Sequence, residues 1–597
     1  MAAAQKKKRA ERVLSFRMRI GLTMILVMLL LLGGRLFHVQ GLDPAGHAQA
    51  AVSERLRSVP LPAHRGDILD AQNRVLATSV DRYDIVADQQ VVDDFVRLDE
   101  GTGLREEVPV QTGIAELSEV LEIDAEELTD RIIGESRYSV VTRSLTPAKS
   151  QEVLDLNIPG LYAEPVTERS YPSGAVAGSI IGFMGSDGPL EGIEAAQDDA
   201  LSGSDGERIF EVGGDGVRIP IATFEELPAE DGQDIRLTID QDLQWFAQES
   251  IAKKSNQYNA AWGNATVVDL TDGDILAMAD SQTVDPAEPG ETEELFRRPL
   301  ALTQDFEPGS TGKAITFAMA LEEGTLNPTD GFTVDNRYEV DGQTISDATR
   351  HPTLDMTAAG IFARSYNTGT VMIGGEIPED VRYDYMKKVG IGEPLDIGLG
   401  TEANSVLRPP EEWDARQHLT TQFGQGYTTS VLHNLQTFQA LANDGVSVPL
   451  NLVDAYIDAD GTEHPAQTAP GERVFSEQTS EEMLRMFEGV VDYGTAQDAA
   501  VAGYRVGGKT GIAEAAGAGG GFDGHTQSFI GMAPLDDPKY LVAVTVHRPQ
   551  GYWRDWEVTD TFREIMSYVL SSYDDAPTGA KSEAYDGFEG ENQDQPW

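Results

Sequence analysis

The architecture of this chain is set by one segment, Phe306-Glu-Pro-Gly-Ser-Thr-Gly-Lys-Ala-Ile-Thr-Phe-Ala-Met-Ala-Leu321. Its Pro-Gly pair indicates a turn, and the residues after the pair predict a helix over 310–323 that Gly324 ends. Ser310 and Lys313 share one face of this helix, in a stripe that is otherwise apolar. A lysine in such a stripe is the exceptional residue of the segment.

This pair can carry nucleophilic chemistry. Burial disfavours a charged amine and lowers its pKa, so Lys313 can accept a proton from Ser310 one helical turn away. The free N–H groups of the helix N-terminus can stabilise an oxyanion. Taken singly, a helix start with a snorkelling lysine explains the pair better. Ser250 and Lys253 repeat the spacing without a preceding turn, and we interpret them as part of a solvated helix face.

Two further motifs favour the catalytic interpretation of Ser310 and Lys313 over the structural one. Ser365-Tyr366-Asn367 follows the first pair along the chain, and Lys509-Thr510-Gly511 follows that triplet. Each tripeptide is common alone. The order S-x-x-K, S-x-N, K-T-G is typical of the serine acyl-transferases that recognise penicillin.

The sequence around these motifs predicts an α+β fold. Residues 265–270 and 275–278 flank an Asp-Gly pair, and residues 528–532 and 540–546 flank a second turn, so both pairs predict β-hairpins. Helical patterns cover 240–254 and 558–570. We therefore expect one antiparallel sheet packed with helices.

Composition excludes several classes of protein. The chain has 597 residues and a net charge of −54, which argues against a nucleic-acid partner. It is 40% apolar, too much for a disordered acidic polymer, and it has no cysteine to supply a thiolate nucleophile or ligand. The histidines show no paired spacing, so we expect no metal and no cofactor. The glycines of 517–521 lack the Lys-Ser/Thr of a phosphate loop.

A membrane span is predicted near the N-terminus. Residues 1–19 are basic, and Ile20 to Gly34 are uncharged and mostly apolar. With Arg35 snorkelling, the span covers 20–39, and the preceding positive charge places the N-terminus in the cytoplasm and the rest outside. A signal peptide cleaved at Ala48-Gln49-Ala50 and a buried core helix are the alternatives.

Composition shifts suggest how the rest of the chain is divided. Strand, turn and strand are expected over 64–77, helices within 110–160, and loops with short strands over 160–215. The polar stretch Pro228 to Asp234 predicts a domain boundary, and residues 235–239 predict a strand that opens the next domain. The predicted regions are a basic tail (1–19), a membrane helix (20–39), a pedestal (40–232), a catalytic domain (233–573) and a disordered acidic tail (574–597).

On these motifs, the chain resembles a class B penicillin-binding protein, a peptidoglycan D,D-transpeptidase of the septal, actinobacterial-like type. The resemblance covers most of residues 20–572. It implies a transpeptidase domain on an elongated pedestal with a single membrane helix. The segments that carry it, besides the three motifs, are Gln422 to Tyr427, Ser528-Phe529, Ala533-Pro534, Arg65 to Ile68, Arg169 to Pro172 and Gly192 to Glu194.

The resemblance implies roles for the matching residues. Ser310 would attack the penultimate D-Ala of a stem peptide, and Lys313 would take its proton. Ser365 would relay a proton to the leaving amine. Asn367 would hydrogen-bond Lys313 and the substrate amide, and Lys509 would supply positive potential.

Substrate binding would fall to the K-T-G strand. Thr510 and Gly511 would line the site, with Thr510 holding the substrate carboxylate. The backbone N–H groups of Ser310 and Ile512 would form the oxyanion hole. The family usually has Thr where this chain has Ile512, so a hydroxyl is lost there; we expect slower acylation by some β-lactams.

The implied partners are stem peptides ending in D-Ala-D-Ala, β-lactam antibiotics, a membrane-embedded glycan polymerase and other division proteins, with no nucleic acid. An elongation-specific transpeptidase remains an alternative. A serine β-lactamase or D,D-carboxypeptidase would use the same motifs. A β-lactam sensor would need a larger cytoplasmic part than residues 1–19, and a non-catalytic scaffold would not need intact motifs.

Overall fold

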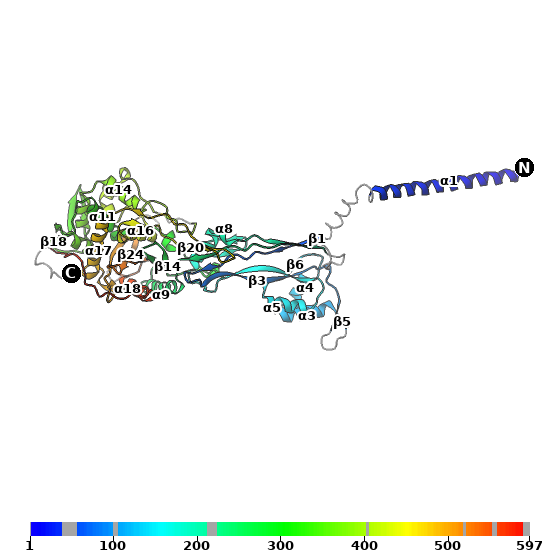
Figure 1. Cartoon of the computed structure of the whole chain (residues 1–597), viewed down its shortest axis with the longest axis horizontal. Coiled ribbons are helices and arrows are strands. Elements are labelled where there is room, and N and C mark those ends of the chain that lie inside the picture. Colours follow the sequence, from blue (N-terminus) through cyan, green and yellow to red (C-terminus); the bar gives the residue numbers. More distant parts are fainter. Residues whose placement is uncertain are drawn as a thin grey trace. The chain divides into compact units, whose positions relative to one another are not determined.

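The computed structural model describes residues 2–38, 56–98, 105–211, 224–400, 405–517, 521–551 and 558–588 (Figure 1). The chain forms two compact units. The first comprises Met1–Ala63 and Ser204–Glu230, and the second comprises His64–Gly203 and Asp231–Trp597.

The first unit contains a long helix and a small sheet. Helix α1 spans Ala2–Phe37, and its segment Leu14–Phe37 is long and apolar enough to cross a membrane. This segment begins six residues before the predicted span, and Val39 lies outside the described residues. The antiparallel sheet has the order β1-β10-β11, with strands Leu56–Leu61, Gly206–Glu211 and Phe224–Leu227.

The second unit is built around a five-stranded antiparallel sheet that confirms both predicted hairpins. Its order is β14-β13-β25-β24-β23. The strands span Ile275–Asp280, Trp262–Asp269, Tyr540–His547, Phe522–Ala533 and Gly507–Ala516.

Helices cover this sheet on both faces, as the predicted α+β fold requires (Figure 1). Helices α9 and α18 pack together on one face, and α11, α16 and α17 belong to the other. Strands β13 and β25 are buried along nearly their whole length. This burial explains the mostly apolar sequence of β25, whereas β13 also buries the polar residues Asn264 and Thr266. The helices span Gln241–Gln257, Thr559–Ser572, Lys313–Glu322, Val431–Ala442 and Glu477–Asp492.

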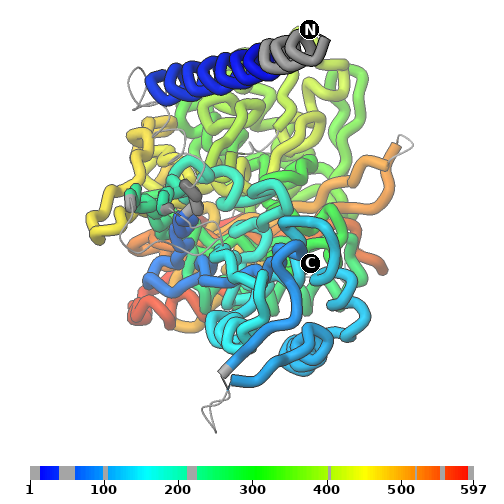
Figure 2. The backbone as a smooth tube through the Cα atoms, turned by 90° about the vertical axis from the view of Figure 1, so that its right-hand side faces the viewer, coloured from blue at the N-terminus to red at the C-terminus, as the bar shows by residue number. Residues whose placement is uncertain are grey.

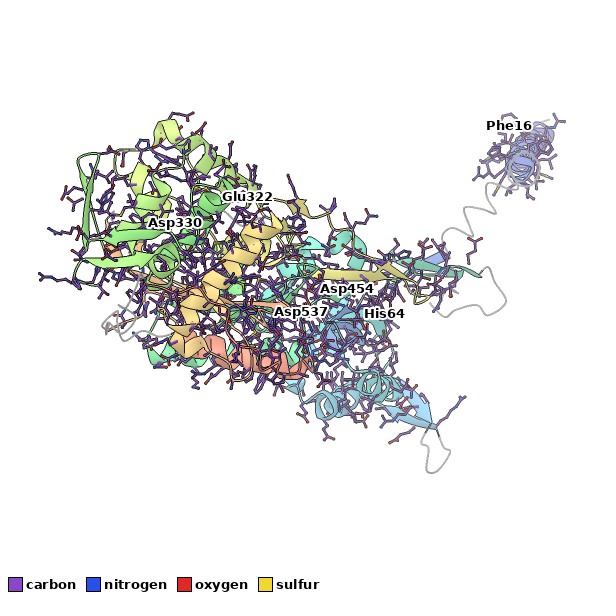
Figure 3. The ribbon with its side chains drawn as sticks, turned by 60° about the vertical axis from the view of Figure 1, so that its left-hand side comes forward. Phe16, His64, Glu322, Asp330, Asp454 and Asp537 are labelled. Atoms are coloured by element: carbon purple, nitrogen blue, oxygen red, sulfur yellow. The ribbon has the colours of Figure 1, made fainter. Side chains whose placement is uncertain are left out.

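A second sheet crosses the predicted domain boundary near residue 232. Its order is β21-β20-β12-β2-β3-β6, and β7 also pairs with β3. Arg236 of β12 donates to Asp454 of β20 over 2.5 Å (Asp454 is labelled in Figure 3). The predicted strand at 235–239 therefore joins pedestal strands. The strands span Glu463–Pro465, Val453–Ile457, Asp234–Leu237, Ile68–Leu69, Val75–Ala87, Ser139–Leu145 and Leu161–Ser170.

The prediction of loops and short strands over 160–215 is wrong for the ten-residue strand β7 and for three short helices, α6 (Gly178–Ile181), α7 (Gly192–Ala196) and α8 (Asp198–Leu201). Strands β3, β6 and β7 share a small core with helices α3, α4 and α5, which form the light-blue cluster at the edge of Figure 2. These helices span Val110–Leu121, Ala125–Ile132 and Pro147–Asp155, within the predicted helical region.

Three pedestal motifs noted in the sequence meet at one buried carboxylate. Glu194 is fully buried and accepts hydrogen bonds from Arg65 Nε over 2.6 Å and from Arg169 Nε over 2.7 Å. Two guanidinium groups compensate the burial of this carboxylate. These motifs therefore act in packing.

The acidic tail was predicted to be disordered from residue 574, but residues 574–588 pack against the catalytic domain. Thr357 Oγ1 donates to Asp586 O over 2.6 Å, and Tyr493 OH donates to Tyr585 O over 2.7 Å. The guanidinium of Arg485 lies 3.9 Å from the centroid of the Tyr585 ring. Aromatic side chains thus hold an otherwise acidic segment, which composition alone did not reveal.

Candidate active site

Ser310 lies in a tight turn rather than in an α-helix. Residues Gly309–Gly312 form the 3-10 turn η4, and helix α11 begins only at Lys313, three residues later than predicted. Gly309 has φ +58°, and a Cβ there would lie 2.5 Å from Ile512 O. Only glycine combines this backbone conformation with so close an approach to strand β23.

Gly511 permits the same approach from the strand side. A Cβ at Gly511 would lie 2.9 Å from Pro308 O and 2.7 Å from Ser528 Oγ. The glycine of the K-T-G motif therefore lets the turn that carries Ser310 pack against β23. This contact brings the first and third motifs together.

Ser365 lies between two helices in a left-handed conformation. It ends α12 (Ala358–Arg364) with φ 62° and ψ 35°, and α13 (Asn367–Gly374) begins two residues later. Lys313 Nζ donates to Ser365 O over 2.5 Å and lies 3.3 Å from Ser365 Oγ. Lys509 Nζ donates to Ser365 Oγ over 2.8 Å. The hydroxyl of the second motif thus contacts both lysines.

Both lysines are fully buried. Burial lowers the pKa of Lys313 to about 7, and the Asp347 carboxylate partly opposes this shift. Burial and the neighbouring Lys313 lower the pKa of Lys509 well below its usual range. Two like charges this close disfavour double protonation. A neutral amine is therefore available near neutral pH.

The remaining site residues surround a cavity of about 520 Å³. Its lining includes Ser310, Ser365, Asn367, Thr510 and Ile512. The Asn367 side chain donates to Ser346 O over 3.2 Å, whereas the family resemblance implied Lys313 as its partner.

Two residues that the motifs did not indicate also belong to the site. Thr495 lines the cavity, and its Oγ1 lies 2.8 Å from Thr510 Oγ1. The side chain of Asp347 is buried at the start of α13. Neither residue has a local sequence signal, because only the fold brings them to the motifs.

Ser250 and Lys253, the second S-x-x-K pair, do not lie together in a buried site. Ser250 is buried on α9, contrary to the predicted solvated position, whereas the Lys253 side chain is 74% exposed and lies 3.6 Å from Glu564. A serine and a lysine in such different environments do not form a nucleophile and base.

A reactive serine turn, two buried lysines and a second serine between them define a site suited to acyl transfer. Ser310 and Ser365 line one cavity, and the two buried lysines that contact Ser365 have a lowered pKa. A neutral amine can remove the hydroxyl proton, and a hydrogen-bonded serine can pass it on. The site therefore belongs to the serine acyl-transferase class.

Comparison with known proteins agrees with this class. The penicillin binding protein transpeptidase domain matches residues 263–567, and the penicillin-binding protein dimerisation domain matches residues 60–189. Penicillin-binding protein PbpB of Mycolicibacterium smegmatis is 30% identical over 586 residues, covering 94% of this chain and 90% of that protein.

Two further relatives match this chain over nearly their whole length. Peptidoglycan D,D-transpeptidase FtsI of Escherichia coli is 28% identical, with 98% of this chain and 97% of that protein covered. The crystal structure of a peptidoglycan synthetase from Bifidobacterium adolescentis has a TM-score of 0.73 and 32% identity, covering 89% of this chain and all of that one. The chain belongs to the class B penicillin-binding protein family. The resemblance, the fold and the enzyme class inferred from the sequence are thereby confirmed.

Proposed function

We propose that this chain is a peptidoglycan D,D-transpeptidase that crosslinks stem peptides during septal cell-wall synthesis. Ser310 Oγ attacks the carbonyl carbon of the penultimate D-Ala while Lys313 accepts the hydroxyl proton. The peptide C–N bond then breaks, and the terminal D-Ala leaves after its amine gains a proton through Ser365. The product is an ester between Ser310 and the donor peptide.

The amine of a second stem peptide resolves this ester. Its nitrogen attacks the ester carbonyl, its proton passes to the site lysine, and Ser310 leaves as a hydroxyl. The backbone N–H groups of Ser310 and Ile512 stabilise the oxyanion in both steps, and Lys509 supplies positive potential. Thr510 holds the terminal carboxylate, with Gly511 allowing the strand to approach the turn.

One observation carries this proposal: both buried lysines contact Ser365, which shares a cavity with Ser310. The relatives named as D,D-transpeptidase and PbpB support the reaction and the septal assignment. β-Lactams resemble the D-Ala-D-Ala terminus, so we expect them to acylate Ser310. An elongation role and a hydrolytic role remain the alternatives.

The domain limits and topology belong to the same proposal. The basic residues before Leu14–Phe37 favour a cytoplasmic N-terminus and a catalytic domain outside the cell. A transpeptidase in that position needs a membrane-embedded glycan polymerase, and we expect this enzyme and other division proteins as partners. We retain 40–232 as the pedestal and 233–573 as the transpeptidase domain.

Labelling with a fluorescent penicillin tests this function. The wild type and Ser250→Ala should form a covalent adduct, and Ser310→Ala should not. The matched serine of the second S-x-x-K pair controls for nonspecific loss. Retained labelling in Ser310→Ala would refute the assigned nucleophile. Rapid release of the label from the wild type would favour a β-lactamase.

A further inference from the structure

A buried carboxylate fixes the start of the helix that follows Ser365. Asp347 Oδ1 accepts hydrogen bonds from the backbone N–H of Asn367 and, over 3.1 Å, from that of Thr368. Asp347 Oδ2 accepts from Thr368 Oγ1 over 2.7 Å. Its side chain is 1% exposed. A carboxylate here satisfies free N–H groups and complements the helix dipole.

His351 contacts the same carboxylate from the other side. Its Nε2 lies 3.0 Å from Asp347 Oδ2, and its Nδ1 lies 2.7 Å from Pro352 O. Both partners are acceptors, and only the imidazole with an N–H on each nitrogen donates to both; in that form it makes an ion pair with Asp347. The ring also stacks on Tyr366, with centroids 4.3 Å apart.

This ion pair holds the S-x-N motif at two points. Asp347 fixes the backbone of Asn367, and His351 packs against the ring of Tyr366, the central residue of the motif. Ser365 immediately precedes these contacts and adopts a left-handed conformation. Non-glycine residues adopt this conformation only where their surroundings hold them there.

The titratable groups on the neighbouring elements are Lys313 on α11, Lys509 on β23, Arg364 on α12 and the Tyr366 hydroxyl. The Asp347 carboxylate acts on two of them, Lys313 and Tyr366. Against the lowering effect of burial, Asp347 raises the pKa of Lys313. Burial raises the pKa of Tyr366, Arg364 opposes this shift, and Asp347 adds to it. The negative charge of Asp347 thus affects the pKa of Lys313, the proposed base.

We propose that Asp347 and His351 are positioning residues for acyl transfer. Their ion pair orients Ser365 and Asn367 and sets the net charge that Lys313 experiences. This inference rests on the proposed function, because it takes Ser310 as the nucleophile and Lys313 as its base. Neither residue contacts the reacting atoms in this role.

The test is the pH profile of acylation by a fluorescent penicillin, measured on the full chain. Asp347→Asn keeps an acceptor but removes the negative charge that stabilises protonated Lys313. Its acid limb should move to lower pH. His351→Gln keeps a donor but removes the positive charge that offsets Asp347, so its acid limb should move to higher pH. We expect about half a pH unit in each direction and about a tenfold lower maximal rate.

The midpoint is the pH at which the rate on the acid limb is half its maximum. In the double variant Asp347→Asn/His351→Gln this midpoint should return towards the wild-type value, because both charges are gone. His464→Gln is the matched control, since its Nε2 lies 2.7 Å from Asp458 in an exposed pair on the β20–β21 hairpin. It should change neither rate nor midpoint.

Lower rates with an unmoved midpoint, or midpoints that move in the same direction, would overturn the positioning role. Circular dichroism of each variant separates these results from unfolding; if Asp347→Asn is unfolded, the midpoint of His351→Gln decides. Failure of the wild type and His464→Gln to label would instead refute the proposed function, and the positioning role with it.

Discussion

Lys509 Nζ donates a hydrogen bond to Ser365 Oγ over 2.8 Å, although 144 positions separate the two residues in the sequence. Lys313 Nζ lies 3.3 Å from the same oxygen. A hydroxyl in contact with two buried amines is well placed to move a proton between base and leaving group. This relationship underlies the first two predictions.

Removing the Ser365 hydroxyl should slow acylation strongly. We expect Ser365→Ala to lower the acylation rate by about 10²–10⁴-fold, the usual contribution of a positioned proton-transfer group. Rapid-quench labelling with a fluorescent penicillin measures the rate. Ser250→Ala, which removes a buried serine on α9, should label at the wild-type rate. A wild-type rate in Ser365→Ala would exclude the relay.

Acylation should depend on pH through Lys313. Only the neutral amine accepts a proton, and its pKa is lowered to about 7. The acylation rate should therefore be low at acid pH and should rise as the pH increases through about 7. A circular dichroism spectrum at each pH would separate protonation from unfolding. A rate independent of pH between about 5 and 8 would contradict this assignment.

Restoring a hydroxyl at position 512 should speed acylation by some β-lactams. Thr510 Oγ1 lies 2.8 Å from Thr495 Oγ1, so part of its hydrogen-bonding capacity is already used within the protein. Ile512→Thr adds a second group for the β-lactam carboxylate. Second-order acylation rates for several β-lactams compare the two proteins. Equal rates for all of them would exclude an effect of Ile512.

The Arg505–Glu488 pair should contribute strongly to stability. Arg505 Nε and Nη2 each donate to a Glu488 oxygen over 2.8 Å, and Glu488 is 1% exposed. The backbone N–H of Glu583 also donates to Glu488, over 2.9 Å. Arg505→Met leaves a buried carboxylate without its cation, so it should lower the free energy of unfolding by about 3–5 kcal/mol.

Urea denaturation measures this change. Lys253→Met is the control, because the Lys253–Glu564 pair is exposed and 3.6 Å long, and it should cost less than about 1 kcal/mol. Equal decreases in the free energy of unfolding of both variants would show that the buried pair stabilises the protein no more than the exposed pair does. Penicillin labelling of Arg505→Met at low temperature would verify that its folded form keeps the site.

Local patterns in the chain were enough to find the main elements of the catalytic sheet. Apolar strands around turn residues predicted the β13–β14 and β24–β25 hairpins, and helical periodicity predicted α9 and α18. The hairpins and helices are short-range features, so neighbouring residues suffice to specify them. The order of the three motifs along the chain indicated the acyl-transferase class.

Long-range contacts determine the rest. The fold turns the predicted helix start at Ser310 into a 3-10 turn, because Gly309 and Gly511 let it approach β23. It also places β12 in the pedestal sheet and Asp347 beside the S-x-N motif. Burial, charge coupling and strand pairing arise between residues far apart in the chain. Local periodicity carries no information about such pairs, so they become visible only when the chain is folded.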